Sequence, residues 1–160
     1  MKLILLFVLS FTTAAFAQDT SWQDLPLTNA QTGETFALAD FAGQTVYVEP
    51  MATWCANCRT QLGNVSKAKT QLGDKVTFVA LSVETTLKAN ELASYAKNQG
   101  FDFTFAVMTP EVLRALAAEF GQAVTSPPST PHFVISPDGT TSELLTGFST
   151  TDEIAALVQQ

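Results

Sequence analysis

The feature that most constrains this chain is a pair of cysteines at a strand-to-helix junction. Cys55 and Cys58 are its only cysteines among 160 residues, and two residues separate them. The preceding segment Thr45–Glu49 is β-branched and aromatic, as in a buried strand. After the pair, Cys58, Leu62 and Val65 recur at helical spacing. Because a helix N-terminus favours a thiolate, the pattern predicts a reversible Cys55–Cys58 disulfide, that is, a thiol–disulfide redox site.

Strand-like and helix-like segments alternate along the rest of the chain. Thr109-Pro110 fits a helix start, and Thr150–Glu153 fits a capping box before the last helix. A turn over 29–35 joins two short extended pieces, and 122–130 is a loop. We expect strands at 45–49, 76–83, 103–107, 132–136 and 142–146, the last two as a hairpin, and helices at 55–72, 87–99, 110–120 and 154–158. This order predicts an α/β fold with a mixed β-sheet covered by helices on both faces.

The first seventeen residues differ from the rest. Met1-Lys2 gives a positive start, Leu3 to Leu9 is nearly all aliphatic, and Ala15-Phe16-Ala17 has the form of a cleavage site. The apolar run is shorter than the roughly 20 residues of an ordinary membrane span. We therefore expect a signal peptide over 1–17, cleaved after Ala17, and one domain over 18–160 in the periplasm or outside the cell. The alternative is that the segment is kept as an N-terminal anchor.

The composition and net charge of the chain limit the classes of binding partner. Hydrophobic residues make up 46% and charged residues 14% of the chain, which indicates a folded protein. The formal net charge of −7 argues against nucleic acid or an anionic membrane surface as a partner. We expect a monomer that needs no cofactor and no metal, with protein thiols and disulfides and a redox partner as its partners.

Two segments carry a resemblance to a known family. One is Ala-Thr-Trp-Cys-Ala-Asn-Cys at 52–58, and the other is Thr-Pro-His-Phe-Val-Ile at 130–135. Together with the order of elements, they resemble the thioredoxin fold and, within it, the TlpA/ResA group of exported thiol–disulfide oxidoreductases. The resemblance covers about 25–158.

The resemblance implies a role for each matching residue. Cys55 would be the exposed nucleophile and Cys58 the resolving thiol. Pro131 would be a cis-proline facing the disulfide, and the backbone of Thr130 would pair with a substrate peptide. An ordinary trans proline at the start of a strand is the alternative for Pro131. Independently of the resemblance, we expect Trp54 to be a contact surface beside Cys55, with a place in the core as the alternative.

Three positions depart from the family pattern. Many relatives have proline just before the second cysteine, where this chain has Asn57, and this residue helps to set the reduction potential. Relatives often kink the helix with a proline at the position of Gly63. TlpA/ResA-type members often place glutamate at the position of Gln61.

The acid lies on the strand instead. Glu49, six residues before Cys55, matches the buried aspartate of thioredoxins. Burial raises the pKa of a carboxyl and suits it to exchange protons with Cys58 near neutrality. The alternative is a solvent-facing Glu49 at a strand end where Pro50 bends the chain outward. Arg59 could add positive potential near the thiolates or simply be a solvated surface residue.

These residues favour an exported thiol–disulfide oxidoreductase, acting as a reductant of other exported proteins. By analogy with the family, its substrates could be cysteines of apocytochrome c or of copper-site proteins. A thiol peroxidase is a weaker reading, because its Pro-x-x-x-Thr-x-x-Cys pattern fails: Thr53 is two and Pro50 five residues before Cys55.

A copper-binding module or carrier is the alternative from another class. Two thiolates of Cys55 and Cys58 would suit Cu(I), and His132 follows Pro131, which the fold would bring near the cysteines. A lone histidine on a strand is, however, more often structural.

Overall fold

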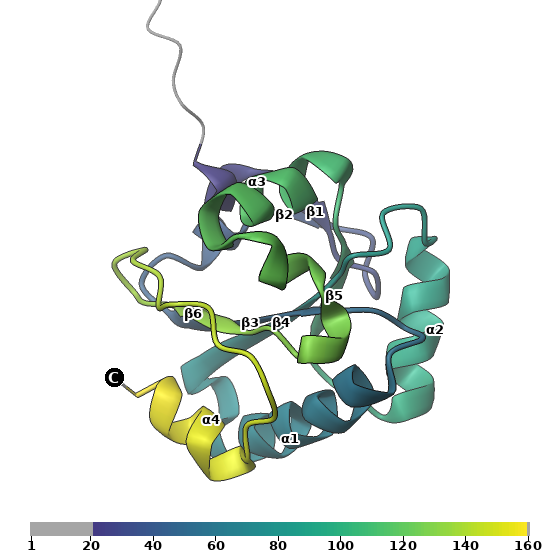
Figure 1. Cartoon of the computed structure of the whole chain (residues 1–160). Helices are drawn as coiled ribbons and strands as arrows, with labels where there is room; N and C mark the ends of the chain where they lie inside the picture. Colours follow the sequence, from purple (N-terminus) through teal and green to yellow (C-terminus); the bar gives the residue numbers. More distant parts are fainter. Residues whose placement is uncertain (1–20, 160) are drawn as a thin grey trace, which may run out of the picture.

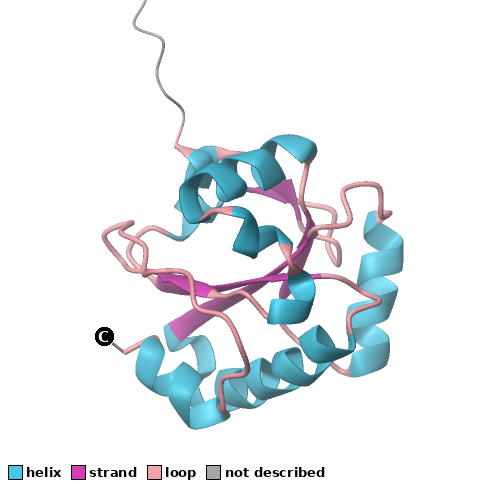
Figure 2. Ribbon diagram, viewed as in Figure 1, coloured by secondary structure: helices cyan, strands magenta, loops and turns pink. Residues whose placement is uncertain are grey.

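The computed structural model describes residues 21–159, which form a central sheet between two layers of helices (Figure 1, Figure 2). The sheet has the order β5-β4-β3-β6. Its strands are β3 (Thr45–Met51), β4 (Val76–Ser82), β5 (Thr104–Val107) and β6 (Phe133–Ile135). Strands β3, β4 and β5 run parallel, and β6 pairs with β3 in the antiparallel direction. The expected mixed sheet of an α/β fold is confirmed.

Helices cover both faces of this sheet. Helices α1 (Ala56–Leu72), α2 (Ala89–Gln99) and α4 (Thr151–Leu157) lie on one face, and α3 (Pro110–Phe120) lies on the other (Figure 1). Two buried clusters follow this division. One joins the apolar residues of α1, α2 and α4 to the sheet, and the other joins those of α3 to the opposite face. Burial on both faces explains why the central strands are almost continuously apolar.

Strand β3 shows this two-sided burial most clearly. Tyr47 and Met51 lie in the cluster under α1, whereas Val46 and Val48 lie in the cluster under α3. Pro50 is buried within the strand and does not bend the chain outward. Strand β6 pairs only with residues 46–48, so Pro50 lies where one side of β3 has no partner strand. A proline is tolerated there because no ladder bond on that side is lost.

The helix ends follow the sequence signals. Thr109 caps α3 through its side chain with Pro110 in the first turn, and Thr150 with Glu153 forms the capping box of α4. Gly100 ends α2 in the left-handed conformation, with φ of 73°. The caps expected at Thr109 and Thr150 are confirmed, and each end satisfies otherwise unpaired helix-end groups.

Short elements complete the domain. Strands β1 (Leu27–Thr28) and β2 (Thr35–Phe36) form the small hairpin expected around residues 29–35. The remaining short elements are 3₁₀ helices: η1 (Trp22–Asp24), η2 (Leu38–Phe41), η3 (Gly73–Lys75), η4 (Gln122–Thr125) and η5 (Pro127–Ser129). The loop expected over 122–130 thus contains two 3₁₀ turns.

One expected strand is wrong. Residues 142–146 form no strand. Leu145 makes a single bridge to His132, and a second bridge, between Ile135 of β6 and Thr141, lies one residue before the expected strand. The Ser142 hydroxyl accepts a hydrogen bond from the Val134 N–H at 3.0 Å, and the Ser142 N–H donates to the Val134 carbonyl at 2.8 Å. The Ser142 side chain thus accepts the bond that a backbone carbonyl would accept in a regular β-ladder, so residues 142–146 do not pair with β6 as a strand.

The expected signal peptide over 1–17 and its cleavage site lie outside the described residues. Within 21–159, none of the helices combines the length and the apolar character needed to cross a bilayer.

Candidate active site

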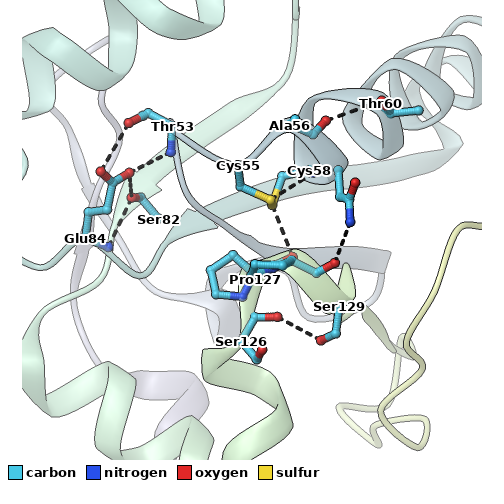
Figure 3. The surroundings of a disulfide bond; sticks show 12 residues. Thr53, Cys55, Ala56, Cys58, Thr60, Ser82, Glu84, Ser126, Pro127 and Ser129 are labelled. Carbon is cyan, nitrogen blue, oxygen red and sulfur yellow. Dashed lines mark hydrogen bonds between the residues drawn. A yellow bond between two sulfur atoms is a disulfide. The ribbon is translucent and has the colours of Figure 1, made fainter.

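The two cysteines form a disulfide at the start of α1 (Figure 3). Cys55 is the N-cap of the helix and Cys58 lies in its first turn, with 5.3 Å between their Cα atoms. The Cys58 N–H donates to Cys55 Sγ at 3.0 Å. Once the disulfide is reduced, a helix N-terminus in this position would favour the thiolate form of the first sulfur.

The surroundings of the second sulfur are different. Cys58 is fully buried, and its Sγ lies 3.2 Å from the carbonyl oxygen of Pro127 (Figure 3). After reduction, this carbonyl can accept a hydrogen bond from the Cys58 S–H, and a bond to the neutral form disfavours the thiolate. Cys58 is thus the thiol that needs help to lose its proton.

The expectation that Cys55 is exposed is wrong for the disulfide form. The residue is only 3% exposed, and the Pro127 turn lies beside the disulfide (Figure 3). Trp54 itself is 63% exposed, as expected for a contact surface. A second exposed aromatic residue, Phe148, follows Gly147, whose N–H donates to the Ser129 carbonyl at 2.8 Å.

The cis-proline expected at Pro131 is also wrong. All peptide bonds among residues 21–159 are trans. The chain turns instead at Thr130, the one non-glycine residue of this part with a positive φ, at 46°. Pro131 is buried, and Cys58 approaches Pro127 of the same loop.

Thr130 is buried, and its backbone groups are already used. Its N–H donates to the Pro127 carbonyl at 2.8 Å, and its carbonyl accepts from His132 Nδ1 at 2.9 Å. For a hydrogen bond with a substrate peptide, the Thr130 backbone can offer only the second lone pair of its carbonyl oxygen. The substrate-binding role of Thr130 therefore stays a prediction. Asn57, which lies between the two cysteines, donates from Nδ2 to the Pro128 carbonyl at 2.9 Å and connects α1 to the same loop.

Glu49 is buried inside the sheet. It is 1% exposed and lies between Tyr47 and Met51, so strand alternation points it to the face that also holds Cys55 and Cys58. Burial raises the pKa of its carboxyl well above the ordinary value, and a hydrogen bond from Tyr47 partly opposes this. Oε1 is buried without a partner. The solvent-facing alternative is excluded.

A second glutamate, which sequence reasoning missed, holds the active-site loop. Glu84 accepts from the Thr53 N–H at 2.6 Å, from the Thr53 hydroxyl at 3.1 Å and from the Ser82 hydroxyl at 3.3 Å (Figure 3). The strand register contains the signal for this contact. Met51 of β3 pairs with Ser82 of β4, so the residues two positions further on, Thr53 and Glu84, emerge side by side.

His132 is buried and bonded on both ring nitrogens. Nδ1 faces the Thr130 carbonyl, which can only accept, so Nδ1 carries the proton and Nε2 accepts from the Ser149 hydroxyl at 3.0 Å. Burial lowers the pKa of the imidazole, which favours the neutral form. Among residues 21–159, no group of three His, Cys, Asp or Glu side chains is arranged to hold a metal ion.

Two other positions behave differently from the family pattern. Gln61 is fully buried and joins a polar cluster described below. Gly63 lies inside α1, which continues through it to Leu72.

Arg59 is exposed. Burial raises the pKa of Tyr95 on α2, and the charge of Arg59 partly opposes this rise.

Comparison with known proteins identifies relatives of this arrangement. The Redoxin family model matches residues 8–157. The thioredoxin-like protein YneN of Bacillus subtilis (strain 168) is 26% identical over 122 residues, which are 76% of this chain and 68% of that protein.

Solved structures share the fold. A thiol:disulfide interchange protein of the thioredoxin family from Chlorobium tepidum TLS has a TM-score of 0.69 and 24% identity, covering 91% of this chain and 97% of the other. A secreted Mycobacterium tuberculosis disulfide oxidoreductase homologous to E. coli DsbE has a TM-score of 0.63 and 18% identity, covering 86% and 96%. BsSco, of the Sco family of cytochrome c oxidase assembly proteins, has a TM-score of 0.69 and 19% identity, covering 84% and 89%.

Family match, fold and cysteine pair agree. The chain belongs to the Redoxin family and is a thioredoxin-like oxidoreductase with the thioredoxin fold.

Proposed function

We propose that this protein is exported and reduces disulfides of other exported proteins. The observation that carries the proposal is the asymmetry of the cysteine pair: Cys55 lies at the helix N-terminus, whereas Cys58 is buried beside a carbonyl on the sheet face that also holds Glu49. The signal-like segment over 1–17 supports export. One structural neighbour is described as secreted, which agrees with that location.

The reaction begins at Cys55. Its thiolate attacks one sulfur of a substrate disulfide, the substrate S–S bond breaks, and the first substrate thiolate leaves. The exposed Trp54 and Phe148 supply the surface that the substrate contacts.

Resolution uses Cys58 and Glu49. The Cys58 thiol passes its proton through water to the Glu49 carboxylate, and the new thiolate attacks Cys55 Sγ. The mixed disulfide breaks, the Cys55–Cys58 disulfide forms, and the second substrate thiolate leaves. Two electrons have moved from the protein to the substrate, and a redox partner must restore them.

Trapping of mixed disulfides with partner proteins tests this order of reaction steps. Cys58→Ser in the full-length chain should accumulate mixed disulfides on non-reducing gels of the exported fraction, because the second thiol is missing. Cys55→Ser should accumulate few. The same partner pattern from both variants would contradict the division of roles.

The redox equilibrium of the pair against glutathione tests the direction of electron flow. A reduction potential near that of thioredoxin, about −270 mV, agrees with a reductant, whereas a value near that of the oxidant DsbA, about −120 mV, would contradict that role.

A copper carrier is the second candidate, which the structural similarity to BsSco leaves open. Copper binding through Cys55, Cys58 and His132 would require the imidazole to give up its bond to Thr130 or to Ser149. We therefore expect reduced protein to bind Cu(I) no more weakly when His132 is replaced by asparagine. A large loss of Cu(I) affinity in His132→Asn would favour the carrier.

A further inference from the structure

A chain of polar side chains is buried beneath α1, next to Glu49. Tyr47, Glu49 and Gln61 are each no more than 1% exposed, and Ser149 lies in the segment that leads into α4. The proposed reaction uses only Glu49 among them. Polar groups at this depth are costly unless they are bonded, so their arrangement needs an explanation.

The hydrogen bonds run in one direction. The backbone N–H of Ser149 donates to Gln61 Oε1 at 3.0 Å. This fixes the orientation of the amide, because a backbone N–H can only donate, and leaves Nε2 of Gln61 to face the Tyr47 hydroxyl at 3.4 Å. The hydroxyl accepts there, so its single hydrogen is free for Glu49 Oε2, at 3.5 Å.

The start of the chain is itself held in place. Asn64 of α1 donates from Nδ2 to the Ser149 carbonyl at 2.9 Å. The Ser149 hydroxyl donates to His132 Nε2 at 3.0 Å, and the imidazole stacks on the Tyr47 ring with centroids 5.6 Å apart. Ser149 is thus anchored from α1 and from the residue next to β6, and its N–H keeps one direction.

We propose that Ser149, Gln61 and Tyr47 form a directed hydrogen-bond chain that keeps the Tyr47 hydroxyl as a donor to Glu49, which makes Tyr47 and Gln61 positioning residues for proton transfer. The inference rests on the proposed role of Glu49 and extends it. Bonds to ionised groups are shorter and stronger than neutral ones, so the 3.5 Å contact should tighten when Glu49 loses its proton.

A test of the chain must separate the effect of the Tyr47 hydrogen bond on the pKa of Glu49 from the effects of burial and of neighbouring titratable groups. Burial raises the pKa of Glu49, and donation from Tyr47 acts in the opposite direction. Burial also raises the pKa of Tyr47 well above its ordinary value, so this hydroxyl keeps its proton. From α2, Tyr95 interacts electrostatically with Glu49, Glu84 and Arg59. His132, behind Tyr47, has its pKa lowered by burial.

Tyr47→Phe tests the proposal. We would follow the ¹³C resonance of the Glu49 carboxyl in the oxidised protein between pH 4 and pH 10, assigned by its loss in Glu49→Gln. Removal of the donor should raise the midpoint by about one pH unit, a tenfold higher proton affinity. An unchanged or lower midpoint would overturn the proposal.

Tyr95→Phe is the matched control. It also removes a buried tyrosine hydroxyl near Glu49, but that hydroxyl has no hydrogen-bond partner. We expect the Glu49 midpoint to stay within a few tenths of a unit. A shift as large as that of Tyr47→Phe would overturn the proposal, because any loss of local polarity would then suffice.

Gln61→Glu tests the direction of the chain, and on its own it still tests the proposal if Tyr47→Phe does not fold, because an unchanged or lower Glu49 midpoint in Gln61→Glu would overturn it. The new carboxyl still accepts from Ser149, but it offers Tyr47 an acceptor and draws its hydrogen away from Glu49. It also adds charge. The midpoint should therefore rise in Gln61→Glu and rise less when the same change is made in Tyr47→Phe. Equal rises in both backgrounds would show charge alone and overturn the directed chain.

The two claims fail separately. If Glu49→Gln leaves the resolution rate unchanged while Tyr47→Phe shifts the midpoint, the chain stands and the catalytic role of Glu49 fails. If Glu49→Gln slows resolution but Tyr47→Phe leaves the midpoint unchanged, the role of Glu49 stands and the chain fails.

Discussion

Glu49 and Glu84 lie near the active-site loop in opposite surroundings. Glu84 is half-buried and accepts three hydrogen bonds from Thr53 and Ser82. Glu49 is buried, with one long bond from Tyr47 and one oxygen without a partner. The three donors around Glu84 hold its side chain in one place, whereas the burial of Glu49 favours its neutral acid form. Glu84 is suited to brace the loop, and Glu49 to exchange a proton.

The largest expected effect concerns the stability of Glu49→Gln as a function of pH. Because the native pKa is raised, the stability of the wild type is complete below the ordinary value of 4.5. Above it, the unfolded chain ionises first, and the wild type loses up to about 1.4 kcal/mol per pH unit until the native pKa is passed. The variant lacks this loss.

Denaturant unfolding of the oxidised proteins from pH 4 to pH 8 measures the difference. The stability of the variant relative to the wild type should grow with pH. Parallel curves would show that Glu49 ionises as readily in the native state as in the unfolded chain.

Glu84→Gln should behave in the opposite way. Loss of charge-assisted bonds to Thr53 should cost about 1–2 kcal/mol. Glu84→Gln should therefore lower the stability of the protein, whereas Glu49→Gln should raise it above pH 4.5. Denaturant unfolding under the same conditions measures this loss of stability. A Glu84→Gln variant as stable as the wild type would show that Glu84 does not stabilise the active-site loop.

Reactivity of the thiols sharpens the contrast between the two carboxyls. In the reduced protein at pH 6, iodoacetamide should modify Cys55 at least about tenfold faster than Cys58, because the helix N-terminus stabilises only the first thiolate. Glu49→Gln should preserve this preference, since Glu49 acts on Cys58. Mass spectrometry of each cysteine peptide reports the ratio, and equal labelling would refute the assignment.

The smallest expected effect is at Asn57. Its bond to the Pro128 carbonyl is exposed, so Asn57→Ala should cost about 1 kcal/mol or less. It should leave the stability difference between Glu49→Gln and the wild type unchanged. A change in that difference would mean that the two sites are coupled through α1.

Local sequence signals predicted much of the fold because they act over short distances. The caps at Thr109 and Thr150 and the apolar run of β4 each determine their own element. The expected strand at 142–146 failed because the Ser142 side chain competes for the β6 ladder, which alternation alone does not reveal. The turn at Thr130 replaced the expected cis-proline.

The candidate site was predictable where residues are adjacent in the sequence. Cys55, Cys58 and Glu49 lie within ten positions, so the motif brought them together. Glu84 was missed because its contact with Thr53 depends on the register of two parallel strands. The bonds of Gln61 were missed for a similar reason, since Ser149 lies 88 residues away.

The most direct test is the rate at which Cys58 resolves a preformed mixed disulfide. Cys55 would be coupled to thionitrobenzoate, and release of this absorbing thiol would be followed by stopped flow from pH 6 to pH 9. General acid–base help predicts that Glu49→Gln is about 10²-fold slower near pH 7, while Glu84→Gln stays within a few-fold of the wild type. A Glu49→Gln rate equal to that of the wild type across this range would contradict the account.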